Sequence, residues 1–177
     1  MQELVTEAII LESRSGRGKN RQVDLFTKKI GRVRARATSG MKTVSKLSPH
    51  LNPLNLSTIR LVNKNIYLIT DALTKNSFKK IRKNENHLGK ALKTIDLVSK
   101  ITPLNLQDGN LWFYLENSFK NLEFDNSKLL TILGYNPKLA TCINCNNNKV
   151  SCFIPSDQSF VCKQCGNKIK KEEIFKI

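Results

Sequence analysis

Four cysteines in two close pairs constrain the fold of this chain more than any other feature. Cys142 and Cys145 form one Cys-x-x-Cys pair, sixteen residues follow, and Cys162 and Cys165 form the second pair. Two thiolates three positions apart on a tight turn can face one ion, and two such turns supply the four ligands of a tetrahedral Zn²⁺. The residues between the pairs are typical of two short strands joined by a turn. The sequence therefore predicts a zinc hairpin.

Other uses of these cysteines fit the sequence less well. Disulfides are disfavoured in a reducing cytosol, and a single redox Cys-x-x-Cys would leave the second pair unexplained. A deaminase-type catalytic zinc site needs His-x-Glu ahead of the second pair, but His50 and His87 are followed by Leu-Asn and Leu-Gly. We therefore predict a closed structural Zn²⁺ site. Cys152, between the pairs, is expected to be a buried and inert thiol.

From Leu4 to about Leu73 the sequence predicts short strands. IGRVRARAT alternates strictly, so Arg32, Arg34 and Arg36 are expected on one face of a strand and small apolar side chains on the other. Two later apolar runs are joined by Asn63-Lys64-Asn65, which suits a hairpin turn. Five strands in about 70 residues predict a small antiparallel barrel, and an SH3-like barrel fits the pattern almost as well.

A helical period replaces the strand pattern from about residue 76. Its apolar positions predict three helices, over Leu88–Val98, Leu111–Leu122 and Ser127–Leu133. Pro103 prevents the first helix from continuing, and Asp108 is a suitable N-cap for the second. A further short helix is expected over the last ten residues, KIKKEEIFKI. The middle of the chain is therefore a small helical unit.

Positive charge points to a polyanionic partner. The chain has 30 Lys and Arg against 14 Asp and Glu, a formal net charge of +16. Lys is weak evidence, because A+T-biased coding also enriches it, but six of the eight Arg lie between Arg14 and Arg36. We predict that DNA contacts come from this cluster and its neighbouring lysines: Arg14, Arg17, Lys19, Arg21, Lys28, Lys29, Arg32, Arg34, Arg36, Lys42 and Lys46.

The cationic cluster is expected to act through backbone phosphates. Alternate side chains on one strand project about 6.6 Å apart, close to the phosphate spacing of a nucleic acid strand. Phe26 is the only aromatic residue before Tyr67, so base stacking should not dominate the affinity. We expect weak sequence preference and an affinity that falls steeply with salt. The alternative is a charged face that is simply solvated.

Two stretches of the sequence resemble the bacterial RecO family of recombination mediators. Residues 7–73 have a first strand, a loop, an LFT…G turn, a basic third strand and a closing hairpin in the order of its N-terminal domain. KLLTILGYNPKLATCINC, residues 128–145, is similar to its leucine-rich helix followed by Gly-Tyr-x-Pro and a Cys-x-x-Cys. The order and spacing agree over nearly the whole chain.

This resemblance implies an α+β protein. A five-stranded OB-fold barrel, residues 1–75, would bind nucleic acid, and a small helical domain, residues 76–177, would carry the four-cysteine zinc-binding hairpin at 139–168. It also implies binding of single- and double-stranded DNA, strand annealing, work with RecR, and replacement of SSB by RecA. Members of the family continue with further helices, so the C-terminal helices are expected to be truncated here, and binding of the SSB C-terminal tail depends on them. Lys46 stands where the family has an arginine.

Other function classes are less favoured but stay open. A ribosome- or translation-associated RNA-binding protein would share the small barrel, the structural zinc ribbon and the charge, and an adaptor would use its helices alone. The sequence has no convincing His/Asp/Ser or paired-carboxylate constellation, so we do not expect an enzyme. The apolar stretches are too short to cross a bilayer and the acidic N-terminus is unlike a secretory signal. We expect a cytoplasmic, nucleoid-associated protein with no membrane partner.

Overall fold

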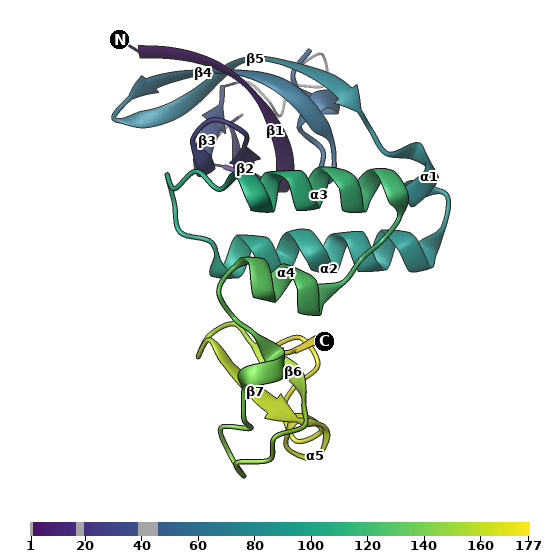
Figure 1. Ribbon diagram of the computed structural model, residues 1–177. Coiled ribbons are helices and arrows are strands. Elements are labelled where there is room, and N and C mark those ends of the chain that lie inside the picture. Colours follow the sequence, from purple (N-terminus) through teal and green to yellow (C-terminus); the bar gives the residue numbers. More distant parts are fainter. Residues whose placement is uncertain (1, 17–19, 39–45) are drawn as a thin grey trace. The chain divides into compact units, whose positions relative to one another are not determined.

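The computed structural model describes residues 2–16, 20–38 and 46–177 (Figure 1). The chain divides into two compact units, Met1–Leu122 and Glu123–Ile177, which are described separately below. The first unit contains a β-barrel followed by helices, and the second contains a helix and a small sheet that carries the cysteine pairs. The domain division between residues 75 and 76 stays a prediction.

The first unit is built on a closed five-stranded barrel. Its strands are β1 (Gln2–Ser15), β2 (Arg21–Thr27), β3 (Gly31–Ala37), β4 (Leu56–Lys64) and β5 (Ile66–Asn76). They are joined in the order β1-β2-β3-β5-β4, and β1 closes the barrel against β4. A register shift between Ile10 and Glu12 bends β1, which pairs with β4 along its first half and with β2 along its second. This arrangement confirms the α+β class and the OB-like barrel.

The alternating sequence of β3 fills the barrel from one side. Val33, Ala35 and Ala37 point into the core, whereas Arg34 and Arg36 are exposed. The β3–β5 pair is parallel, and the other neighbouring pairs in the barrel are antiparallel. The predicted hairpin at residues 63–65 is confirmed as the β4–β5 turn. The barrel therefore buries one face of β3 and leaves its arginine face outside.

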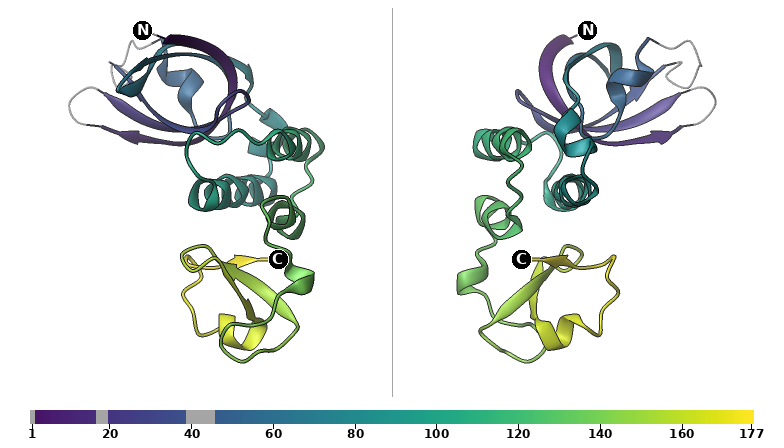
Figure 2. Two further views of the ribbon diagram at one scale, coloured as in Figure 1. Left: turned by 60° about the vertical axis from the view of Figure 1, so that its left-hand side comes forward. Right: turned by 90° about the vertical axis from the view of Figure 1, so that its right-hand side faces the viewer.

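Helices follow the barrel and cover one side of it (Figure 1, Figure 2). A 3-10 turn, η1 (Ser48–Leu51), precedes β4, and β5 is followed by α1 (Lys79–Arg82), α2 (Glu85–Ile101) and α3 (Gly109–Asn121). The side chains of Asn84 and Asp108 accept hydrogen bonds from backbone N–H groups and cap α2 and α3. Trp112 of α3 stacks on Phe26 of β2 with 6.3 Å between the ring centroids. The predicted helices are confirmed, and α2 ends before Pro103 as expected.

The second unit is a small sheet with short helical segments. These are α4 (Asn126–Ile132), η2 (Pro137–Leu139) and α5 (Lys163–Gly166), and the sheet has the order β7-β6-β8, with β6 (Val150–Ile154), β7 (Ser159–Cys162) and β8 (Phe175–Lys176). Phe153 packs against Tyr135 and Phe160, with ring centroids 5.1 and 5.0 Å apart. The predicted hairpin between the cysteine pairs is confirmed as β6 and β7.

One element was predicted wrongly. The last ten residues form turns and β8 rather than a helix. Phe175 is buried and pairs with Phe153 of β6, so pairing with an existing sheet edge replaces the expected helix. Among the described residues, no helix has both the length and the apolar character that crossing a membrane requires.

Candidate metal centre and candidate nucleic-acid groove

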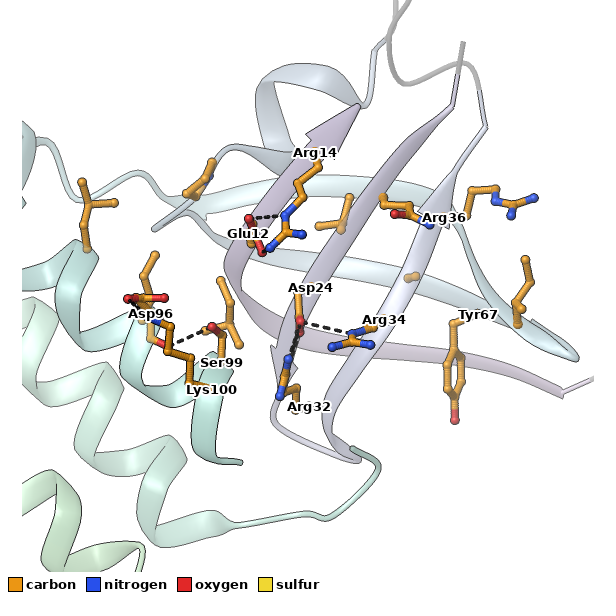
Figure 3. Close-up of a pocket in the computed structure, with 18 residues that line it drawn as sticks. Glu12, Arg14, Asp24, Arg32, Arg34, Arg36, Tyr67, Asp96, Ser99 and Lys100 are labelled. Carbon is orange, nitrogen blue, oxygen red and sulfur yellow. Dashed lines mark hydrogen bonds and ion pairs between the residues drawn. The ribbon is translucent and has the colours of Figure 1, made fainter. Parts of the chain in front are cut away.

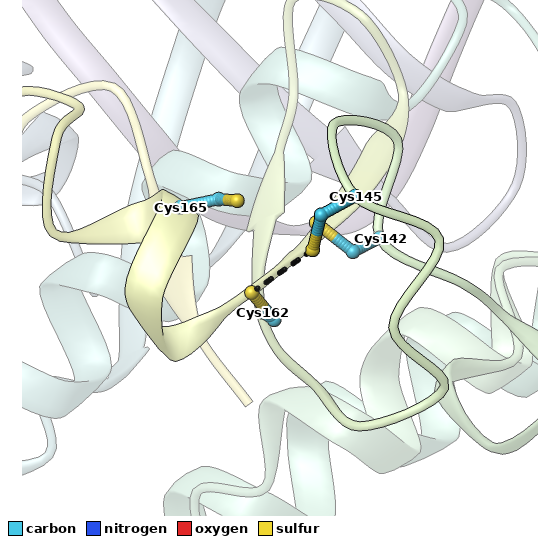
Figure 4. Close-up of side chains that lie close together, drawn as sticks. All are labelled: Cys142, Cys145, Cys162 and Cys165. Atoms are coloured by element: carbon cyan, nitrogen blue, oxygen red, sulfur yellow. Dashed lines mark hydrogen bonds between the residues drawn. The ribbon is translucent and has the colours of Figure 1, made fainter.

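The two cysteine pairs meet at one point of the second unit (Figure 4). The four Sγ atoms of Cys142, Cys145, Cys162 and Cys165 all lie within 4.8 Å of one another, and those of Cys145 and Cys162 are 3.7 Å apart. Tetrahedral Zn–S bonds of about 2.3 Å place sulfur atoms about 3.8 Å apart. The sequence prediction that these residues come together is confirmed, and their geometry suits a metal ion.

Backbone turns aim both pairs at this point. In the first turn the N–H of Cys142 donates to the carbonyl of Asn147 at 2.9 Å, and the N–H of Asn146 donates to the carbonyl of Cys142 at 2.8 Å. Cys162 ends β7 and Cys165 lies in α5, so the β6–β7 hairpin brings the second pair to the first. The two pairs are therefore held by short turns on one hairpin rather than by a large core.

Electrostatics in the cluster also favour a cation. A hydrogen bond from the backbone N–H of Cys162 lowers the pKa of Cys142 to about 6. Hydrogen bonding with the side chains of Cys162 and Cys145 raises the pKa of Cys165 to about 12. Hydrogen bonding within the cluster thus lowers the pKa of Cys142 and Cys162 and raises that of Cys165. A bound divalent ion would favour the thiolate form of all four cysteines, since thiolate is the form that binds metal.

Cys152 lies outside the cluster, as predicted. It is buried on β6, and all five cysteines are free of disulfides. A Cβ placed on Gly166 would lie 3.3 Å from the Cys152 sulfur, so this thiol fills the space behind the second cysteine turn. Its position is that of a packing residue.

An open groove of about 830 Å³ runs between the barrel and α2 in the first unit (Figure 3). The barrel wall carries Arg14, Arg34 and Arg36 together with Tyr67. The side chain of Arg34 is 71% exposed, and Arg36 makes no ion pair with any residue that the structure describes. Arg14 is also exposed, but it pairs with Glu12. The groove is thus lined by four of the predicted DNA-binding residues, namely these three exposed arginines and Arg32.

Arg32 was expected to be exposed on the same face as Arg34 and Arg36, but it is buried. Its side chain is 9% exposed and makes a double hydrogen bond to Asp24, with Nε to Oδ1 at 3.0 Å and Nη2 to Oδ2 at 2.7 Å. Its Nη1 donates to the carbonyl of Thr102 at 2.9 Å. Burial of an arginine requires such pairing, so Arg32 supports the fold in this structure. Periodicity placed it on the right face but could not show what covers that face.

The other predicted cations are spread around the barrel. Arg21 donates to the carbonyl of Ser48, Lys28 pairs with Glu7 at 3.3 Å, and Lys29 donates to a backbone carbonyl. Lys46 is exposed. None of these four lines the groove. Arg17, Lys19 and Lys42 lie outside the described residues. Whether any of the eleven contacts DNA stays a prediction.

Sequence reasoning missed the second wall of the groove. This wall belongs to α2 and includes Leu92, Ile95, Asp96, Ser99 and Lys100. Lys100 pairs with Asp96 at 2.9 Å, an i, i+4 contact that the sequence contains. Nothing in the sequence places this helix opposite β3, because the two are far apart in the chain and only the tertiary fold joins them.

Known proteins similar to this chain are DNA repair proteins. Residues 1–78 match the family described as "Recombination protein O N terminal". A "DNA repair protein RecO" of Caldanaerobacter subterraneus subsp. tengcongensis is 26% identical, with 96% of this chain and 74% of that protein aligned. The protein of the same name from Thermoanaerobacter sp. is 27% identical over 95% of this chain and 73% of its own length. That of Dehalococcoides mccartyi is 28% identical over 92% of this chain and 70% of its length.

Proposed function

Because this chain belongs to the RecO family of DNA repair proteins, we propose that it binds DNA in the groove between the barrel and α2 and anneals complementary strands. The observation that carries the proposal is the pair of exposed guanidinium groups of Arg34 and Arg36 on one wall of this groove. Guanidinium groups bind phosphate oxygens and release condensed counterions, which makes binding favourable and salt-dependent.

Annealing then needs no acid, base or nucleophile. Two DNA strands repel each other through their phosphates, and a protein that neutralises some of these charges lowers the cost of bringing complementary bases together. The protein is a mediator rather than an enzyme in this proposal. With RecR, it assists the loading of RecA onto DNA coated with SSB, as the resemblance to the family implies.

The cysteine cluster has a structural role in this proposal. Cys142, Cys145, Cys162 and Cys165 hold one Zn²⁺ and leave no coordination position for a substrate. The ion, when bound, stabilises the fold of the second unit by joining its two cysteine turns.

Annealing of complementary, SSB-coated oligonucleotides tests the proposal. We compare the wild type with Arg34→Gln/Arg36→Gln and with Lys138→Gln/Lys149→Gln, which removes the same charge from exposed positions in the second unit. The wild type and the lysine variant should accelerate annealing, and the arginine variant should lose most of this effect. Equal loss in both variants, or no acceleration by the wild type, would contradict the proposal. Binding to structured RNA without annealing would favour a translation-associated role instead.

A further inference from the structure

The connection between α2 and α3, residues 102–107, lies along the free part of β3. β5 pairs with β3 only from Ala35 to Ala37. Ahead of that stretch, Leu104 forms a parallel bridge with Arg32, and the N–H of Asn105 donates to the carbonyl of Arg32 at 2.7 Å. The connection therefore completes an edge that the barrel leaves open.

Arg32 ties the C-terminal end of α2 to the barrel. Thr102 is the C-cap of α2, and its carbonyl accepts the 2.9 Å hydrogen bond from Arg32 Nη1. The remaining donors of the guanidinium bind Asp24 of β2, whose side chain is 11% exposed. The double hydrogen bond to Asp24 fixes the orientation of the buried Arg32 guanidinium. Its hydrogen bond to the Thr102 carbonyl therefore fixes the position of the last turn of α2.

Gly31 allows the connection to approach this closely. Its φ of +70° lies in the region that favours glycine, and a Cβ at this position would overlap the carbonyl oxygen of Leu106. Gln107 adds a hydrogen bond from its Nε2 to the carbonyl of Lys28 at 3.2 Å. A residue with a side chain at position 31 would push the connection, and with it the end of α2, away from β3.

The two walls of the groove differ in chemistry. The α2 wall presents the apolar side chain of Leu92, which is 41% exposed, and its charged residues Asp96 and Lys100 pair with each other. The barrel wall presents the guanidinium groups described above, together with the carboxylates of Glu12 and Asp24. Arg34 and Arg36 are the exposed cations of this wall that make no ion pair shorter than 3.7 Å with any described residue. A single DNA strand has the same two sides, because its phosphates are anionic and its unpaired bases are largely apolar on their faces. A duplex offers its phosphates and base edges but not the faces of its bases, since these are stacked inside.

Building on the proposed function, we infer that the groove takes a single DNA strand with its phosphates toward Arg34 and Arg36 and its bases toward α2. Arg32 and Gly31 are positioning residues in this arrangement: they hold the α2 wall at the distance that a single strand fills. Arg32 itself touches no phosphate.

Two variants that move the α2 wall without changing the net charge test this inference. Gly31→Ala adds only a methyl group, and Asp24→Asn/Arg32→Gln removes one charge of each sign. Both should weaken binding of a single-stranded oligonucleotide by roughly tenfold, the order of one lost base contact. In Gly31→Ala the duplex affinity should stay within about twofold, and the salt slope for single strands should not change, because the phosphate contacts remain. Asp24→Asn/Arg32→Gln also removes the carboxylate 3.7 Å from Arg34, so its salt slope should not become shallower. Trp112, the only tryptophan, should report the displacement by a change in fluorescence, since it stacks on Phe26 next to the connection.

Leu92→Ser changes the α2 wall of the groove but leaves the connection between α2 and α3 unaltered. Leu92 is partly exposed, so its replacement should leave the urea midpoint nearly unchanged while single-strand affinity falls with the salt slope preserved. This variant keeps the inference testable if Gly31→Ala fails to fold.

The outcomes separate this inference from the proposed function. Equal losses for single strands and duplex, a shallower salt slope in Asp24→Asn/Arg32→Gln, or full single-strand affinity in Leu92→Ser would overturn the inference. Failure of Arg34→Gln/Arg36→Gln to weaken DNA binding would instead overturn the proposed DNA groove.

Discussion

Replacing Arg34 and Arg36 by glutamine gives the most direct measure of how this protein holds DNA. Both side chains are exposed on the barrel wall of the groove, and among the described residues only Arg34 of the two forms an ion pair, with Asp24 at 3.7 Å. If each guanidinium neutralises one phosphate, each contributes about 0.7 to the slope of log K against log salt for a single strand. The double variant should therefore have a slope that is shallower by about 1.4.

The loss of affinity follows from this slope. At 0.1 M NaCl the double variant should bind about 25-fold more weakly, or about 1.9 kcal/mol, and at about 0.5 M the difference should shrink to about threefold. Fluorescence anisotropy of a labelled oligonucleotide at several salt concentrations measures both values. Lys138→Gln/Lys149→Gln serves as the charge-matched control. An unchanged slope, or a loss that is the same at every salt concentration, would refute the idea that these two side chains contact phosphates.

Three further predictions concern stability and metal binding. Cys162→Ser should lose bound zinc and the structure of the second unit, whereas Cys152→Ser should keep one zinc per chain; measurement of metal content that shows the opposite pattern would contradict the proposed site. Leu61→Ala, at a fully buried barrel position, should lower the free energy of unfolding by about 3 kcal/mol in urea denaturation, and a loss below about 1 kcal/mol would contradict the barrel core. The pKa of Glu7 is lowered, chiefly by its hydrogen bond with Lys75, so the stability that Glu7 contributes should be present above pH 4.5 and lost as the pH falls through its lower folded-state pKa. Urea denaturation at several pH values should show a smaller loss of stability with acid in Glu7→Gln than in the wild type, and equal losses would contradict this role of the Glu7–Lys75 pair.

Local patterns predicted most of the individual elements. The alternation in IGRVRARAT specified a strand with one apolar face, and the predicted N-cap Asp108 lies where α3 begins. These features depend on neighbours within a few positions, which the sequence displays directly. The C-terminal segment shows the limit of such reasoning. A helix was expected there, but Phe175 pairs with β6, a contact that no local pattern reveals.

The sequence by itself determined that the four cysteines come together, because the spacing of the two Cys-x-x-Cys pairs is typical of four thiols placed around one point. It also determined that arginines gather on one strand of a small barrel. Only the tertiary structure decided what each arginine does. Arg32 and Arg34 are two positions apart on the same face of β3 and both line the groove, yet Arg32 is buried against Asp24 and the end of α2, whereas Arg34 is exposed. Periodicity fixes the face of a strand, but burial and charge pairing depend on the distant segment that packs against that face.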